Sequence, residues 1–572
     1  MKTTRYVHLT FLCLIFLVVL FRPIPLQAES QQPKLILQIT VDQLRGDLPT
    51  RYYERLGDGG IRYLWENGTV YTNAHHSHAN NETIVGHATL ATGATPAAHG
   101  MIGNVWLDRT TGETVYNIED ARYRLLTPGS DVDRSTEIDP TQRAARSEGR
   151  SPSAILVSTF GDELKAHSNG LSKVFAVSVK DRGAVSLAGH AGTAYWFSKA
   201  SGKFVTSSYY MDQYPEWVDA WNNLNHPMRY ADTEWQLMHR QDSYLFGESD
   251  DREWETELAG FGRIFPHPYG SADSPYFNTL LTLSPAGDEL VLDFAKAVIE
   301  NEALGRDDVV DFLGVSFSST DYVGHIFGPS SLEGEDNILR LDQTIAALLT
   351  YVDETVGLDN TLIVLSADHG GPDTPGYSNS LGLQGGYIDP ASWDRDSAID
   401  RIKEAFSIEG KLIENYEHPY VYLAPEIATR KDSEREAIER AVVQELARMP
   451  GVSTAISSRS LEYGNVPDTE MTRAVLKNFN AKRSGDVYVV FEPNWFINDF
   501  DGLVVASTHG SPWRYDSFVP IVFSGPGILP KNVSRRVHTV DIALTLSKLF
   551  QTKPPSGASG KVLTEVLEES TN

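Results

Sequence analysis

The chain has 572 residues, of which 76 are acidic and 49 are basic, and its formal net charge is −27. So acidic a protein is a poor candidate for nucleic-acid binding, because phosphate backbones require a basic surface. The single cysteine, Cys13, lies in an N-terminal apolar run. A chain that has lost this run can form neither a disulfide nor a thiolate metal site.

The first 28 residues are typical of a secretory signal peptide. Lys2 and Arg5 precede an apolar run from Leu9 to Phe21, and polar residues follow Ala28. The run is shorter than the roughly 20 apolar residues that a membrane span needs; an uncleaved anchor is the alternative. We therefore expect cleavage after Ala28, export to the periplasm or the cell exterior, and a mature chain without a stable membrane span.

Four apolar runs predict parallel strands that are buried on both faces. Each run ends beside polar residues: Leu35–Val41 beside Asp42, Val174–Val179 beside Lys180 and Arg182, Phe312–Ser318 beside Asp321 and His325, and Leu362–Ser366 beside Asp368 and His369. Ligands of open α/β sheets gather at the carboxyl ends of strands. Any one of these residues alone could be an ordinary turn or surface charge, but together they indicate a binding site.

The remaining core elements predict an α/β fold with a mostly parallel sheet flanked by helices. Apolar residues at helical spacing predict a crossover helix over Ile338–Val356, which implies a right-handed parallel unit. Further along, Val504–Ala506 leads to His509, and Val519–Ser524 predicts another core strand.

Thr83 is the candidate nucleophile. It precedes a small-residue segment, His87–Thr92, that predicts a short helix ended by Gly93. At a helix start, unpaired backbone N–H groups and the positive end of the dipole favour an anion, which suits attack on a phosphoryl group. The alternative is that Thr83 is only the N-cap of this helix.

Two segments are expected to interrupt a single catalytic domain that spans residues 29–572. Residues from about 183 to 311 are rich in aromatic side chains and are expected to form an insert that faces the substrate. Residues from about 393 to 486 are expected to form a compact crown of mixed α and β structure. Within it we predict a strand at Tyr420–Leu423 and a helix at Ser433–Met449 that begins with a capping box between Ser433 and Glu436.

For the other polar residues, roles outside the catalytic chemistry are expected or two interpretations stay open. A solvated loop, rather than a further metal site, is expected for His75, His76 and His78, and structural roles are expected for His87 and His99. Asp541 is expected to cap the last core helix. For Glu82 two interpretations stay open: it disfavours anionic substrates next to Thr83, or it points to solvent.

The candidate ligands favour zinc. Carboxylates and imidazoles without thiolate suit catalytic zinc. Two groups of three such residues plus a hydroxyl would make a site in which one ion activates the nucleophile and the other steadies the leaving group.

These motifs resemble the alkaline phosphatase superfamily, most closely its PafA-like branch of periplasmic phosphatases, near the type I phosphodiesterases and nucleotide pyrophosphatases. The resemblance rests on VDQLRGD, NNETIVGHATLATG, GMIGN, VKDRG, STDYVGH, ADHGG and STHGSPW. It implies two zinc ions, one held by Asp321, His325 and His509, the other by Asp42, Asp368, His369 and the Thr83 oxygen. It also implies that Thr83 is phosphorylated transiently and that the phosphoryl group is bound by Asn104, Lys180 and Arg182.

A count of charges agrees with a monoester substrate. Two zinc ions with three aspartates carry a formal charge of +1, which Lys180 and Arg182 raise to +3, against −3 for a monoester dianion and the Thr83 alkoxide. The sequence therefore predicts an exported zinc-dependent phosphomonoesterase of broad specificity that acts on small-molecule phosphate esters. The alternatives are a phosphodiesterase or nucleotide pyrophosphatase with the same metals, or a non-catalytic binding protein that retains the fold. A sulfatase is disfavoured, because its C/S-x-P-x-R motif is absent.

Overall fold

The structure is a computed structural model that describes residues 32–258, 260–500 and 502–568. The predicted signal peptide, Cys13 and the expected cleavage site at Ala28 lie outside the described residues. Within the described ranges, none of the helices combines the length and the apolar character that crossing a membrane requires.

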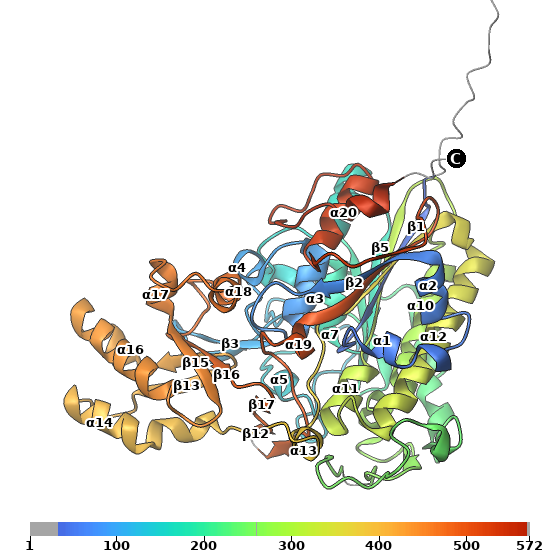
Figure 1. The fold of residues 1–572 in the computed structure, drawn as a ribbon. Helices are drawn as coiled ribbons and strands as arrows, with labels where there is room; N and C mark the ends of the chain where they lie inside the picture. The colour runs from blue at the N-terminus through green and yellow to red at the C-terminus, as the bar shows by residue number, and fades with distance from the viewer. Residues whose placement is uncertain (1–31, 259, 501, 569–572) are drawn as a thin grey trace, which may run out of the picture.

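A 10-stranded sheet forms the centre of the molecule (Figure 1). Its order is β21 (Lys531–Val533), β2 (Gly68–His75), β20 (Phe518–Ser524), β11 (Thr361–Ser366), β1 (Leu35–Val41), β10 (Asp311–Phe317), β5 (Val174–Ser178), β6 (Thr193–Ser198) and β7 (Lys203–Val205), with β22 (Val537–His538) paired to β2. The strands from β11 to β6 are parallel, whereas β20 runs antiparallel to β11 and β2. The predicted mostly parallel sheet is confirmed.

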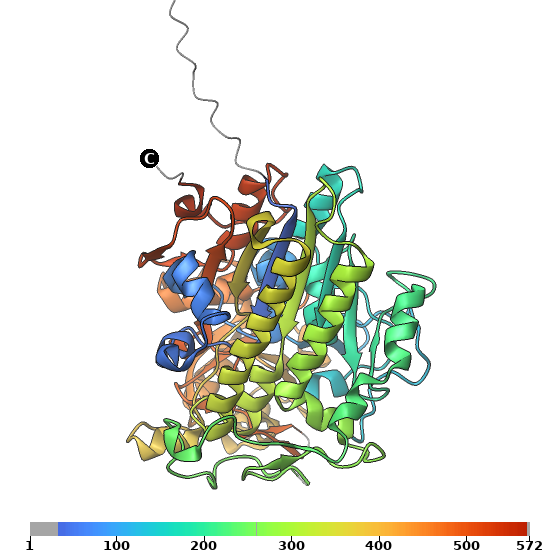
Figure 2. The same ribbon diagram turned by 90° about the vertical axis from the view of Figure 1, so that its right-hand side faces the viewer.

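Helices cover both faces of this sheet. Figure 2 shows α10 (Pro285–Asn301) and α12 (Leu332–Thr355) across one face, while α3 (Thr83–Thr92), α7 (Asp181–Ala188) and α20 (Asp541–Leu549) lie behind the other. Strand β1 shows why both faces are apolar: Leu35 and Leu37 belong to the same buried cluster as α10 and α12, whereas Ile36 belongs to the cluster around α20. Successive side chains of a strand point to opposite faces, so a central strand must be apolar throughout.

The expected insert at 183–311 is wrong in its first part. Strands β6 and β7 continue the central sheet, and α10 covers it. The aromatic side chains Tyr195, Trp196 and Trp221 are buried in the core rather than facing a substrate.

The crown residues form a separate sheet. Strands β13 (Ile413–Glu417), β14 (Tyr420–Leu423), β16 (Val487–Phe491) and β15 (Val452–Ser457) are antiparallel, and α14 (Ser397–Ala405) and α16 (Asp432–Leu446) pack on them. In Figure 1 these orange elements stand to the left of the central sheet. The predicted capping box is wrong: α16 begins one residue earlier, its N-cap is Lys431, and no side chain caps it.

Candidate active site

The polar residues predicted at the strand ends converge at one edge of the sheet. Asp42 directly follows β1, and α11 (Ser319–Ile326) begins just beyond the neighbouring strand β10. This helix carries Asp321 and His325 one turn apart, and Nε2 of His325 lies 3.3 Å from Oδ1 of Asp321. Asp368 and His369 follow β11 on the other side of β1.

Together with His509, these residues form two groups of metal-type side chains, that is, carboxylates and imidazoles of the kind that bind metal ions. One group is Asp321, His325 and His509, the other is Asp42, Asp368 and His369, and within each group the donor atoms lie within 4.8 Å of one another. The groups adjoin each other, because the rings of His369 and His509 stack at 3.6 Å.

The second group fits a metal ion by its hydrogen bonding. Oδ1 of Asp42 and Nε2 of His369 are buried and make no hydrogen bond. Oδ2 of Asp42 and Oδ2 of Asp368 do have partners, because each lies 2.9 Å from a nitrogen of Lys180 or His87. Buried polar atoms normally have a hydrogen-bond partner, so the two unpartnered atoms point to a bound cation. Their oxygen and imidazole chemistry suits zinc.

The three histidines present the same ring nitrogen to the site. Nδ1 of His325 donates to the carbonyl of Ser507 at 2.8 Å, and Nδ1 of His509 donates to that of Asn81 at 2.7 Å. His369 makes the equivalent bond to Gly370 at 2.8 Å. Because Nδ1 carries the proton in each ring, the Nε2 lone pair is left for a metal ion.

Thr83 is the first residue of α3, with Glu82 at the N-cap position and no side-chain capping bond. The helix therefore begins four residues before the predicted start at His87, and the alternative role of Thr83 as an N-cap is wrong. Gly93 ends the helix as predicted, with a left-handed φ of 64°. Close packing explains Gly86, because a Cβ there would lie 1.8 Å from the carbonyl oxygen of Asp368.

Two cations meet at the Thr83 hydroxyl. Nη2 of Arg182 lies 3.2 Å from Oγ1, and Nζ of Lys180 lies 3.5 Å from it. Lys180 is the N-cap of α7 and Arg182 lies in its first turn, so both follow β5 as the sequence predicted.

Lys180 also joins the two groups. Its fully buried Nζ lies 2.9 Å from Oδ2 of Asp42 and contacts Oδ2 of Asp321. Burial alone would lower the pKa of Lys180, but Asp321 and Asp42 outweigh that effect and raise it. The lysine therefore stays charged between the groups.

Asp139 is a site residue that the sequence did not reveal. It is the N-cap of α5 (Pro140–Arg143), where it accepts from the backbone of Thr141 and Gln142, and its Oδ2 lies 2.7 Å from Nη1 of Arg182. Burial opposes ionisation of Asp139, yet Arg182 holds its pKa below the usual range. No local signal could have found it, since an aspartate before proline is an ordinary helix cap.

Asn104 and Glu82 are linked to each other next to the nucleophile. Oδ1 of Asn104 accepts from the N–H of Ile84 at 3.1 Å, which leaves the amide nitrogen as the donor to a ligand. Oε2 of Glu82 accepts from the N–H of Asn104 at 2.9 Å and from Nδ2 of Asn80 at 2.8 Å. Glu82 is thus held at the site rather than simply pointing to solvent.

Gln43 is a second missed residue. Its Nε2 donates to Oδ1 of Asp321 at 2.8 Å, and its backbone adopts a left-handed φ of 65° that most residues avoid. Its amide packs so closely that a Cβ at Gly324 would lie 1.8 Å from Oε1. The glycine of STDYVGH therefore makes room for the residue after Asp42.

Expectations for the other histidines and for Asp541 have mixed outcomes. His75, His76 and His78 are buried, so the expected solvated loop is wrong. His87 is buried with Nδ1 2.9 Å from Oδ2 of Asp368, and its structural role stays a prediction. His99 is also buried, with Nε2 3.1 Å from the hydroxyl of Thr89.

Asp541 does not cap α20, and that expectation is wrong. It is the first residue of the helix, and the N-cap is Val540. Its carboxylate instead accepts from the backbone N–H groups of His538 and Lys561, at 2.9 and 2.6 Å. Asp541 therefore ties the C-terminal segment to the loop before the helix.

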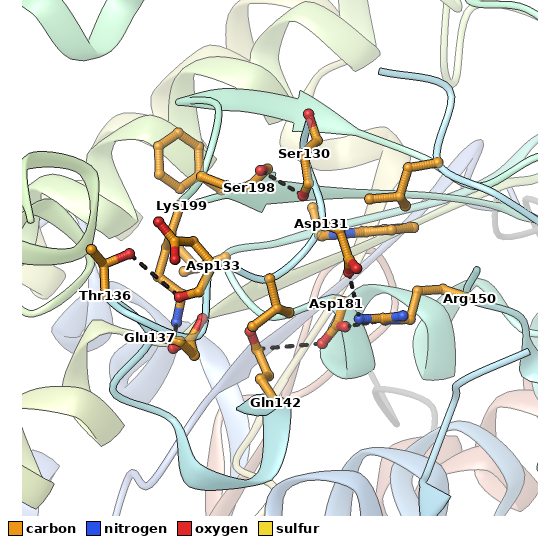
Figure 3. Close-up of a pocket in the computed structure, with 16 residues that line it drawn as sticks. Ser130, Asp131, Asp133, Thr136, Glu137, Gln142, Arg150, Asp181, Ser198 and Lys199 are labelled. Carbon is orange, nitrogen blue, oxygen red and sulfur yellow. Dashed lines mark hydrogen bonds and ion pairs between the residues drawn. The ribbon is translucent and has the colours of Figure 1, made fainter. Parts of the chain in front are cut away.

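Two cavities adjoin these residues. One, of about 70 Å³, is lined by Asn104, Arg182 and the Asp321 group. The other, of about 30 Å³, is shown in Figure 3, where Lys199 contacts Glu137 and Arg150 lies beside Asp181. This second space holds little more than a water molecule, so it is too small to be a substrate site.

Comparisons with known proteins agree with this geometry. The family model described as "Type I phosphodiesterase / nucleotide pyrophosphatase" matches residues 36–512. Alkaline phosphatase PhoV of Synechococcus elongatus is 34% identical, over 94% of this chain and 93% of its own. A Myroides odoratus protein named calcium-transporting ATPase is 33% identical, over 95% of this chain and 96% of its own.

Alkaline phosphatase PafA of Elizabethkingia meningoseptica is also similar. It is 33% identical, over 94% of this chain and 95% of its own. A crystal structure of wild-type PafA superimposes with a TM-score of 0.84 at 32% identity, covering 94% of this chain and 99% of that chain. The likeness therefore extends over nearly the whole molecule in both sequence and fold.

Proposed function

This chain belongs to the type I phosphodiesterase / nucleotide pyrophosphatase family and is a phosphoric monoester hydrolase of the alkaline phosphatase type, and we propose that it uses two zinc ions, a phosphothreonine at Thr83 and a broad range of small-molecule phosphate esters. The observation that carries the proposal is the meeting of Lys180 and Arg182 at Oγ1 of Thr83, beside two groups of metal-type side chains.

The two groups would each hold one zinc ion, the first at Asp321, His325 and His509, the second at Asp42, Asp368 and His369 with Thr83. When bound, the ions would supply Lewis acidity and positive charge at the nucleophile and at the leaving oxygen. The protein contributes a fixed arrangement of the ligands, since backbone carbonyls orient each imidazole.

In the proposed reaction, the Thr83 hydroxyl gives up its proton to water, Oγ1 attacks phosphorus, and the bond from phosphorus to the leaving oxygen breaks. The alcohol departs and takes up a proton from water, and the phosphoryl group stays on Thr83 until water cleaves the Oγ–P bond and releases inorganic phosphate. Lys180, Arg182 and the amide nitrogen of Asn104 donate to phosphoryl oxygens. Donors fixed in advance stabilise developing charge without reorganising during the reaction.

The charge count from the sequence needs one correction. It omitted Asp139, whose buried carboxylate pairs with Arg182 and lowers the formal charge of the site from +3 to +2. By the same count, a charge of +2 balances a singly charged diester with the Thr83 alkoxide, which together carry −2, better than a monoester with the alkoxide. Charge balance therefore no longer supports a monoester. Support for monoesters comes instead from the alkaline phosphatase relatives and from the two cationic donors at Thr83.

Phosphodiester hydrolysis is the second candidate, and the matching family model favours keeping it. A diester has one fewer charged oxygen for a cation to bind, so Lys180 would matter less to it. A non-catalytic role is opposed by the joint presence of the nucleophile, both metal-type groups and the cationic donors. Export to the periplasm or cell exterior is part of the proposal and rests on the sequence of the first 28 residues.

The deciding experiment compares hydrolysis of an aryl phosphomonoester with that of the matching diester, with zinc counted in the same sample. We expect a preference for the monoester and about two zinc ions per chain. Lys180→Ala should lower kcat/KM for the monoester roughly 100-fold and affect the diester less. A diester preference would overturn the monoesterase proposal, and a zinc-free active enzyme would overturn the metal assignment.

A further inference from the structure

The cavity above the site reaches only one of the two metal-type groups. Asp321, His325 and His509 line it, whereas Asp42 and Asp368 do not. The cavity therefore continues from the group whose ion would face the leaving oxygen. The residues that line the outer part of this cavity would therefore contact the leaving alcohol rather than the transferred phosphoryl group.

A hairpin supplies one apolar wall of this cavity. Strand β18 (Asp499–Phe500) pairs antiparallel with β19 (Leu503–Val504), and Phe500 lies directly opposite Leu503. Directly paired residues share a face of a hairpin, and both of these line the cavity. The other pair includes Val504, which does not line the cavity and is 46% exposed.

This wall is fixed to the metal-type side chains. Beyond the hairpin, the N–H of Ala506 donates to the carbonyl of His325 at 2.8 Å, and the carbonyl of Ser507 accepts from Nδ1 of the same histidine at 2.8 Å. Two residues further on, the chain reaches His509. The apolar wall is thus held in a set position relative to two residues of the group.

Two further apolar residues line the cavity. They are Ile138 and Ile326, which are buried, and Leu503 packs against the hydrophobic cluster that contains both of them. Ile138 directly precedes Asp139, whose pairing with Arg182 fixes this turn beside the phosphoryl donors. Apolar side chains from the hairpin, from the segment before α5 and from α11 therefore line the space that a leaving group would fill.

The charges at this cavity disfavour an anionic leaving group. Glu82 and Asp139 both line it. Among the described residues that line the cavity, Arg182 is the only lysine or arginine, and it is already paired with Asp139. A carboxylate or second phosphate on the leaving group would meet negative charge without a free cation.

We infer that Phe500, Leu503 and Ile138 form a leaving-group subsite for uncharged, apolar alcohols and phenols. Phosphomonoesters of such alcohols are then better substrates than sugar phosphates, nucleotides or carboxylated esters. The inference rests on the proposed phosphomonoesterase function, and it narrows the broad specificity proposed there to a ranked preference.

The test compares benzyl phosphate with methyl phosphate, because the two leaving alcohols have similar acidity and differ mainly in apolar surface. We expect the wild-type protein to show a kcat/KM about ten-fold higher for benzyl phosphate. Phe500→Ala and Leu503→Ala should each lower this ratio several-fold, because each removes apolar contact with the benzyl group that the methyl group does not make. Val504→Ala, on the outer face of the same hairpin, should change neither rate.

Three results would overturn the subsite: a wild-type ratio near one, a ratio that is unchanged in the Phe500→Ala/Leu503→Ala double variant, or 4-carboxybenzyl phosphate as good a substrate as benzyl phosphate. A melting temperature and a zinc content like those of the wild type in each variant guard against a misfolded protein. Failure of the proposed function looks different, since neither monoester would then be hydrolysed while a diester was.

Discussion

Arg182 and Asp139 form a buried ion pair in which Nη1 lies 2.7 Å from Oδ2 of the carboxylate, while Nη2 lies 3.2 Å from Oγ1 of Thr83. The two ends of one guanidinium thus contact a fixed anion and the nucleophile. Because this group is planar and rigid, the first contact determines the direction of the second.

Replacing Asp139 by asparagine should strengthen phosphate binding. Asparagine keeps an oxygen at the Oδ1 position, which caps α5, but it replaces the Oδ2 that accepts from Arg182 by an NH2 group. It also removes one negative charge near a dianionic ligand. We expect the inhibition constant for inorganic phosphate to fall about five-fold. Competitive inhibition assays at low and high salt would measure this, and unchanged or weaker inhibition would contradict it.

Replacing Thr83 by alanine should abolish turnover and leave the fold intact. The side chain makes no capping bond, so its loss removes a nucleophile without uncapping α3. Thr83→Ser keeps the hydroxyl and should retain activity. Wild-type-like hydrolysis by Thr83→Ala, with melting temperature and zinc content also matching the wild type, would rule out this nucleophile.

Replacing Gln43 by alanine should weaken metal binding at the Asp321 group. The variant loses the hydrogen bond from Nε2 to Oδ1 of Asp321, and loss of such a supporting bond typically lowers metal affinity 10- to 100-fold. Titration with a chelator, followed by counting the retained zinc, measures the effect. Equal retention in wild type and variant would show that Gln43 does not position this ligand.

Glu255 should make stability depend on pH. Burial and the neighbouring carboxylate of Glu333 raise the pKa of Glu255 from 4.5 to about 10. A raised folded-state pKa favours the protonated form, so its stabilising contribution is complete below about pH 4.5 and decreases as pH rises toward 10. Glu255→Gln should therefore melt at a higher temperature than wild type at pH 9, with a smaller difference at pH 5.

A matched control for this measurement is Glu257→Gln, two residues along the chain. Glu257 is exposed, so its neutralisation should leave the melting profile nearly unchanged. If Glu255→Gln and wild type melt alike across the whole pH range, Glu255 is not held in a protonated form.

Residues at strand ends were predictable from the sequence because local patterns determine them. An apolar run followed by a polar residue places Asp42, Lys180 or Asp368 at the carboxyl edge of a sheet wherever the strand lies in it. The division of the metal-type residues into two groups came from the resemblance, and the structure brings the same residues together.

The residues that the sequence missed depend on distant contacts. Asp139 becomes a site residue only because α5 lies against α7, and the burial of His76 requires Ala367 and Thr539, whose oxygens it contacts. The aromatic residues of β6 were misinterpreted because their burial depends on α10, about 100 residues later in the chain. A single sequence carries no local signal for such contacts.

The position of β1 between β10 and β11 helps to keep the distances between the carboxylates of the site constant when the sequence elsewhere changes. Strand β1 is hydrogen-bonded on one side to β10 and on the other to β11, and each of the three strands leads into a carboxylate of the site. The lateral offsets between these carboxylates are therefore inherited from the spacing of paired strands, about 4.8 Å. Side chains of the leaving-group wall and of the crown can change without altering this spacing, so substrate choice can vary while the reaction centre keeps its dimensions.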